Sequence, residues 1–196
     1  MFQLRYILGF LGFIAFIIFI IVLIARLATQ NGRQQLDLAP TARLAEAAST
    51  DADFVFTESG PIVAEEEHYQ IRITVNRSGR RIEVIRGFQN NVVASADFGN
   101  NEEAFRSFLA AIDRTGYSRE RSTDFDNEEG LCPKGRRYVF TSDQFGEDFR
   151  RWDTSCMNVR GSFGGSINTA RELYQDQIPD YNRFISGVRR DTELSI

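Results

Sequence analysis

An apolar run near the start of the chain sets the strongest limit on its structure. Nineteen consecutive residues, from Ile7 to Ala25, carry no charged or strongly polar side chain and consist mainly of Ile, Leu and Phe. As an α-helix this run would span about 28 Å, close to the hydrocarbon thickness of a bilayer. In lipid a helix satisfies its own backbone hydrogen bonds, whereas in water it would need a shell that the remaining polar sequence does not offer. The run therefore predicts a transmembrane helix over residues 7–27, with the lipid bilayer as a partner.

Two kinds of N-terminal segment begin with a basic residue and an apolar stretch, namely a cleaved signal peptide and an uncleaved signal anchor. The apolar core of a signal peptide is usually only about 7–15 residues long. Cleavage also needs small residues at the last and third-last positions, but Ala28 is preceded there by Arg26, and Ala25 by Leu23. We therefore expect an uncleaved anchor, and a cleaved signal peptide is the alternative.

The charges that flank the run leave its orientation nearly balanced. Arg5 and the terminal amine precede it, whereas Arg26 and Arg33 follow it. A short N-terminal flank, residues 1–6, ahead of a long C-terminal part is the usual arrangement of a signal anchor. We therefore expect a single-pass protein of the cell membrane, with residues 1–6 in the cytoplasm and the C-terminal part outside it.

Cys132 and Cys156 are the only cysteines, and the sequence between them is typical of a β-hairpin. We expect strands at 136–141 and 148–153, with a turn at 143–146. The midpoint of the two cysteines is position 144, so an antiparallel pairing folded at that turn would bring them within disulfide distance. A disulfide suits an oxidising compartment. Two buried free thiols in a cytoplasmic domain are the alternative.

Hydrophobic spacing predicts a small α+β domain over residues 54–196. A period of two predicts a three-stranded antiparallel meander between residues 69 and 98, and in its third strand one face would carry Val92, Ala94, Ala96 and Phe98. A helix follows, with Asn100 and Glu103 as its start box. After the hairpin come two more helices, the first of them capped by Ser166. The predicted order is βββ-α-ββ-α-α.

Two regions of biased composition frame this domain. Residues 28–53 are rich in Ala, Gln, Thr and Asp, a composition that buries little apolar surface, so we expect a stalk between the anchor and the domain. Residues 36–196 carry 20 basic and 27 acidic side chains, a net charge of −7, because three of the 23 basic residues precede position 36. This acidic balance argues against nucleic acid as a partner.

An acidic stretch is the first candidate for chemistry. Asp124, Asp126 and Glu128 have the alternate spacing of a calcium loop, but Gly130 stands one place late and Gly135 occupies the twelfth position, where a glutamate belongs. Asp124 and Asp126 are also the carboxylates that an envelope hydrolase would use. We expect a solvated acidic loop here, with a metal site as the weaker alternative, and no motif indicates a cofactor.

A glycine-rich loop and a lone histidine are the other candidates. Gly164, Gly165 and Ser166 precede a predicted helix and could present backbone N–H groups to an anionic ligand. The lysine of a P-loop is absent, so a tight turn followed by a serine cap explains the same residues. His68 is the only histidine and follows three glutamates, which indicates a solvated surface position.

Four motifs in the second half of the chain carry a resemblance to a known group of proteins. They are C-P-K-G-x-R-Y from Cys132, R-x-W-D-T-S-C ending at Cys156, G-x-F-G-G from Gly161, and Q-I-P-D-Y ending at Tyr181. The stretch resembles uncharacterised membrane-anchored proteins of patescibacteria, over roughly the last two-thirds of the chain. The resemblance implies an anchored cell-surface module, and it carries over no activity and no functional residue.

These observations favour a non-catalytic module that binds a membrane or surface protein, or that serves in envelope assembly. An envelope hydrolase using carboxylates is the alternative. A pilin-like assembly subunit is a second alternative, because Gly9 and Phe10 resemble the processing site of type IV pilins. That site should have glutamate as the fifth residue after the glycine, and here the residue is Ile14.

Overall fold

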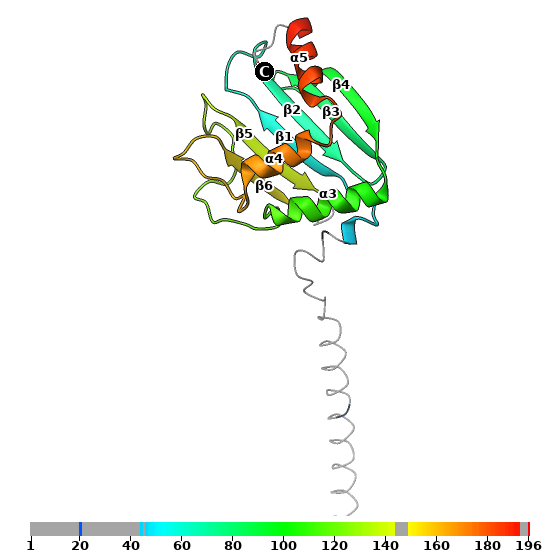
Figure 1. Ribbon diagram of the computed structural model, residues 1–196. Coiled ribbons are helices and arrows are strands. Elements are labelled where there is room, and N and C mark those ends of the chain that lie inside the picture. Colours follow the sequence, from blue (N-terminus) through cyan, green and yellow to red (C-terminus); the bar gives the residue numbers. More distant parts are fainter. Residues whose placement is uncertain (1–19, 21–43, 45, 144–148, 193–195) are drawn as a thin grey trace, which may run out of the picture. The chain divides into compact units, whose positions relative to one another are not determined.

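The structure is a computed structural model that describes residues 20, 44, 46–143, 149–192 and 196 (Figure 1). The chain divides into two compact units, Met1–Ala39 and Pro40–Ile196. No helix among the described residues is long and apolar enough to cross a membrane. The transmembrane helix expected over 7–27 lies outside the described residues, which include only Ile20 from that segment.

The second unit is built on a six-stranded antiparallel sheet with helices packed against it, so the expected α+β class is confirmed. The order of strands across the sheet is β4-β3-β2-β1-β5-β6. Their bounds are β1 (Phe54–Ser59), β2 (Tyr69–Val75), β3 (Gly79–Arg86), β4 (Asn91–Gly99), β5 (Arg137–Ser142) and β6 (Arg150–Thr154). The expected meander is β2-β3-β4 and the expected hairpin strands are β5 and β6, and both sets of pairings are confirmed. Residues 144–146 of the expected hairpin turn lie outside the described residues.

Strand β1 is absent from the predicted order, and it joins the two predicted pieces into one sheet. It pairs with β2 on one side and with β5 on the other. Phe54, Phe56 and Glu58 are its buried positions. The inward row therefore ends on a carboxylate, which breaks the apolar alternation that identifies a strand in sequence.

Three helices lie across one face of the sheet (Figure 1): α3 (Glu102–Arg114), α4 (Ile167–Gln175) and α5 (Tyr181–Thr192). The cap of α3 is Asn101, whose Oδ1 accepts the Ala104 N–H at 2.9 Å, so the predicted start at Asn100 is one residue early. The predicted apolar stripe of this helix is confirmed, since its buried residues are Phe105, Phe108, Leu109 and Ile112. They belong to the core cluster, in which Phe105 lies edge-on to Phe54 of β1 with ring centroids 5.8 Å apart.

A β-bulge changes the predicted face of β4. The register of β3 with β4 shifts between Val84 and Ile85, so that Ile85 pairs with Val92 while Val84 pairs with Ala94. Ala94 and Phe98 pack against the core, whereas Val92 is 40% exposed. The prediction that Val92 shares a face with Ala94 is therefore wrong, because an extra residue in one strand reverses the alternation beyond it.

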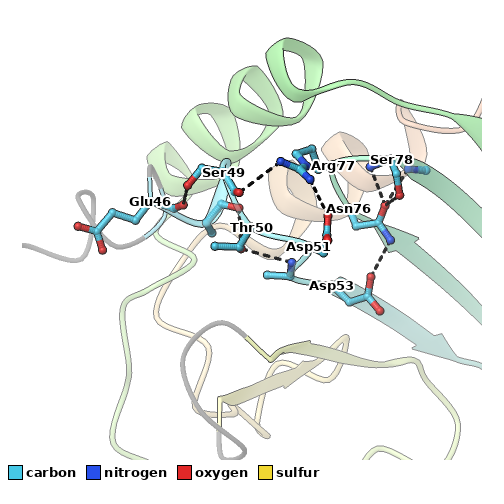
Figure 2. Close-up of polar contacts among 11 residues, drawn as sticks. Glu46, Ser49, Thr50, Asp51, Asp53, Asn76, Arg77 and Ser78 are labelled. Atoms are coloured by element: carbon cyan, nitrogen blue, oxygen red, sulfur yellow. Dashed lines mark hydrogen bonds and ion pairs between the residues drawn. The ribbon is translucent and has the colours of Figure 1, made fainter.

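The segment just before β1 is fixed to the β2–β3 hairpin (Figure 2). Asn76 Nδ2 donates to Asp53 Oδ1 at 2.8 Å, and Arg77 forms an ion pair of 3.1 Å with Asp51. Arg77 also reaches the carbonyl oxygen of Ser49. We call these contacts the N-terminal clamp.

Apolar residues of the same segment belong to the core. Leu44, Ala47 and Ala48 are at most 1% exposed, and Ala52 is 6% exposed. This packing extends the globular unit N-terminal to Phe54, into residues that we expect to be stalk. The composition of 28–53 as a whole hides these few buried positions, because small residues contribute little to a hydrophobic signal.

Candidate functional site

The two cysteines form the expected disulfide. The Sγ atoms of Cys132 and Cys156 are 2.00 Å apart and their Cα atoms are 5.7 Å apart. Cys132 precedes β5 and Cys156 follows β6, so the bridge closes the open end of the hairpin. Gly135 packs beside it, since a Cβ atom at this position would lie 2.5 Å from Cys132 Sγ. The disulfide thus fixes the loop that leads into β5.

The acidic stretch that we considered as a metal site does not converge. Asp124 and Asp126 are exposed, whereas Glu128 accepts hydrogen bonds from Arg150 Nη2 at 2.7 and 2.5 Å. Within the part of the chain that the structure describes, no group of three or more His, Cys, Asp or Glu side chains could hold a metal ion. The carboxylates of Asp124 and Asp126 likewise stand in solvent rather than in a shared pocket.

Backbone N–H groups of the glycine-rich loop already donate hydrogen bonds within the chain. The Gly164 N–H donates to Arg119 O at 3.1 Å, and the Ser166 N–H donates to Thr115 O at 2.8 Å. Ser166 precedes α4 without a side-chain hydrogen bond to the helix backbone, and its hydroxyl contacts Thr169 Oγ1 instead. A Cβ atom at Gly165 would collide with Thr115 O. The loop therefore packs closely against Arg119 and Thr115, and the N–H groups of Gly164 and Ser166 are used within the chain.

A cavity of about 460 Å³ lies at the other surface of the sheet, away from the helices. Its base consists of Ser59, Gln70 and Arg137, which form one row across three strands because Ser59 pairs with both of the others. Loops supply its walls through Ile62, His68, Phe88 and residues 128–130. We call this space the strand-end cavity, because β1 ends there and β2 and β5 begin there.

His68 is part of the cavity wall and not a solvated residue, so its predicted surface position is wrong. It is only 1% exposed, and its ring stacks on Phe88 with centroids 4.1 Å apart. Its Nδ1 lies 2.8 Å from Pro61 O, and since a carbonyl only accepts, Nδ1 carries the proton. Burial lowers the pKa of His68, the hydrogen bond to Pro61 opposes this, and the charge of Arg137 lowers the pKa further.

Arg137 is a buried cation with little compensation from the protein. It is 6% exposed, and its Nη2 donates to Gly60 O at 2.6 Å. No carboxylate among the described residues forms an ion pair with it. Burial lowers the pKa of Arg137, and the more distant charge of Glu128 acts in the opposite direction. A guanidinium has five N–H donors, and among the described residues Arg137 donates one hydrogen bond, so other donors are available to a ligand in the cavity.

The preceding residue, Arg136, points to the other face of the sheet and has an ion-pair partner there. Its Nη1 donates to Glu58 Oε1, and this carboxylate is only 1% exposed. Burial acts to lower the pKa of Arg136, but the charge of Glu58 and nearby tyrosines raise the pKa above its ordinary value. Two adjacent arginines thus point to opposite faces of β5, one into an ion pair and one into the strand-end cavity.

The mouth of the cavity has an apolar rim. Phe88 is 53% exposed, and Ile62 is 39% exposed. The Ile62 N–H donates to Pro133 O at 2.8 Å, which links this rim to the disulfide loop. The position of the rim therefore depends on the Cys132–Cys156 bridge. An apolar rim around a few buried polar groups is the usual composition of a ligand-binding pocket.

The one described hydrogen bond of the His68 ring is to a backbone carbonyl. His68 uses Nδ1 for the carbonyl of Pro61, and no described hydroxyl or thiol forms a hydrogen bond with its ring. A catalytic serine would need such a bond to an imidazole base. Comparison with known proteins finds no match to this chain among family models, curated proteins or solved structures.

The sequence did not predict this cavity, and the lining residues it singled out, His68, Glu128 and Gly130, were interpreted in other roles. The one usable signal is the Arg136–Arg137 pair at the start of a predicted strand, since alternation must send one of the two arginines to each face. His68 gave no signal, because three preceding glutamates indicate solvent. The loop at 61–67 folds back instead, with the Glu67 and His68 N–H groups bonded to Ala64 O.

Proposed function

We propose that this chain is a membrane-anchored, extracytoplasmic module that binds a partner without catalysis. Residues 7–27 would hold it in the bilayer, and residues 1–6 would remain in the cytoplasm. The apolar run and its flanks support the anchor, and the disulfide between Cys132 and Cys156 suits the oxidising side of the membrane. The partner is a membrane or surface protein.

The strand-end cavity is the observation that carries this proposal. It combines an exposed apolar rim, with Phe88 the most exposed rim residue, and a buried cation on its floor. Exposed aromatic residues beside a pocket are typical of recognition sites, because they lose little conformational entropy on binding. The exposed positions of Asp124 and Asp126 give no comparable support to the hydrolase alternative.

Site-specific photo-crosslinking in intact cells tests the binding role. A photoreactive amino acid would replace Phe88 in the full-length chain, and the matched control would replace Met157, which is 95% exposed. We expect discrete adducts from position 88 and none of the same size from position 157. Equal adducts at both positions, or none at position 88, would contradict the proposal.

Protease treatment of intact cells tests the location. If the anchor is uncleaved and the globular unit is outside, an added protease should remove the part of the chain after Arg26 and leave a short membrane fragment. Protection of the whole C-terminal part would place it in the cytoplasm. Recovery of the full-length chain without detergent would refute the anchor itself.

A further inference from the structure

We infer that the strand-end cavity binds a carboxylate group attached to an apolar body, and that Arg137 is the residue that holds the carboxylate. This inference rests on the proposed binding role and adds the chemistry of what is bound. Two sources share this chemistry, namely a free hydrophobic amino acid and the C-terminal residue of a peptide chain. The experiment below distinguishes them.

The first argument is the charge of Arg137. A buried ion is normally paired or fully hydrogen-bonded, because removal from water is costly otherwise. Arg137 is 6% exposed and has one hydrogen bond, to Gly60 O, with no ion-pair partner among the described residues. Its neighbour Arg136 has Glu58. An anion in the cavity would give Arg137 the compensation that its neighbour already has.

The second argument is the set of donors around that charge. Ser59 pairs with Arg137 across β1 and β5, and Gln70 pairs with Ser59 across β1 and β2, all on the cavity face. A hydroxyl, an amide NH₂ and a guanidinium in one row can together satisfy the oxygens of a carboxylate. A planar guanidinium also matches a carboxylate with two parallel hydrogen bonds.

The third argument concerns the acidic wall and the rim. Glu128 lines the cavity and its charge acts on Arg137, but both of its oxygens accept hydrogen bonds from Arg150 and it forms no ion pair with Arg137. Phe88 and Ile62 offer apolar surface at the mouth, and the cavity of about 460 Å³ can hold one amino-acid-sized group. The ligand therefore needs an apolar body beside its carboxylate.

Binding is measured with the full-length chain in detergent micelles and two matched pairs of probes. N-acetyl-L-phenylalanine and the tetrapeptide Gly-Gly-Gly-Phe carry the carboxylate, and their amides have the same shape without the charge. Free L-phenylalanine is the fifth probe. Titrations followed by calorimetry or ligand-observed NMR give the dissociation constants. We expect the acids to bind about 10- to 100-fold more tightly than the amides, the range for a lost charge-assisted hydrogen bond.

Three variants connect this preference to the residue. Arg137→Gln should lose the preference for acids, whereas Arg183→Gln, at a side chain that is 82% exposed on α5, should bind as the unmodified chain does. Ser59→Asp places a carboxylate directly opposite Arg137 and should abolish binding while the chain stays folded. Ser59→Asp keeps the test valid if Arg137→Gln unfolds.

The outcomes distinguish the carboxylate inference from the proposed binding role, and a free amino acid from a peptide C-terminus. Equal binding of acids and amides, no binding of any acid at millimolar concentration, or tight acid binding by Ser59→Asp would overturn the inference. If one of these results is obtained while crosslinked adducts still form at position 88, the proposed binding role is retained and the inference of a carboxylate ligand is rejected. Tighter binding of the tetrapeptide than of L-phenylalanine indicates a peptide C-terminus, and the reverse order indicates a free amino acid.

Discussion

Replacing Arg136 and Arg137 one at a time compares an arginine that has an ion-pair partner with one that has none among the described residues. Arg136→Gln leaves the carboxylate of Glu58, which is 1% exposed, without its partner. Removal of one member of a fully buried pair costs about 3–5 kcal/mol. Because the Arg136 side chain is 42% exposed, water can replace part of the interaction, and we expect a loss of about 2–3 kcal/mol.

Arg137→Gln should behave differently although it lies one position further along the chain. It removes a hydrogen bond to Gly60 O, worth about 1 kcal/mol, but it also removes a buried charge that has no ion-pair partner among the described residues. These two effects oppose each other, so we expect the free energy of unfolding to stay within about 1 kcal/mol of the unmodified chain.

Tryptophan fluorescence measures this difference directly. Trp152 is the only tryptophan, it is 2% exposed, and it lies in the globular unit, so its emission reports on that unit even when the whole chain is in detergent. A loss of about 2–3 kcal/mol should lower the midpoint of thermal unfolding by about 5–10 °C for a unit of this size. Arg137→Gln should shift it by less than about 3 °C.

A double variant is the control for the ion pair. Glu58→Gln together with Arg136→Gln removes both charges, and part of the stability lost in Arg136→Gln should return. If Arg137→Gln lowers the midpoint as much as Arg136→Gln, or if the double variant recovers nothing, the reasoning about paired and unpaired charge is refuted.

Three other predictions concern the disulfide, the histidine and a packed glycine. Cys132→Ala with Cys156→Ala opens a loop with a sequence separation of 24, so denaturant titration should show a loss of about 3 kcal/mol, and an unchanged midpoint would contradict this. The pKa of His68 in the folded chain lies below its ordinary value of 6.5. As the pH falls below 6.5, the unfolded chain therefore binds a proton before the folded chain does, and the free energy of unfolding decreases until the pH is below the lowered pKa. His68→Phe should flatten this part of the stability profile, and an unaltered slope would exclude His68 as its source. Gly161→Ala would place a Cβ atom against Trp152 O and should destabilise by about 2–4 kcal/mol, whereas Gly99→Ala, with no atom within 4 Å, should lose less than about 1 kcal/mol, as thermal unfolding can check.

The parts of the fold that could be predicted are the segments in which apolar residues recur with a single strand or helix period along the whole segment. Strand β2 alternates regularly, and α3 carries four buried apolar residues at helical spacing. Strand β1 could not be identified, because a buried Glu58 stands where the pattern requires an apolar residue. Its carboxylate is tolerated there only because Arg136, far away in the sequence, pairs with it.

The candidate site could not be predicted for a different reason. Ser59, His68, Phe88 and Arg137 come from four separate parts of the sequence, and the one motif that contains any of them, C-P-K-G-x-R-Y with Arg137, assigns no function to it. Only the register of β1 with β2 and β5 brings Ser59, Gln70 and Arg137 into one row. The disulfide was accessible to sequence reasoning because the hairpin that aligns Cys132 and Cys156 is local.

The N-terminal clamp decides how the globular unit would respond to mechanical tension. Chain upstream of β1 is fixed to the β2–β3 hairpin through Asp51 and Asp53, so a pull from that side first strains these contacts. Beyond them the force runs along β1, which has six register pairs with β2 and six with β5. Both ladders lie parallel to the pull and must shear together rather than open one bond at a time. A partner bound at the strand-end cavity would hold the opposite end of the same strand, so tension between partner and tether would pass along a strand that is paired on both sides.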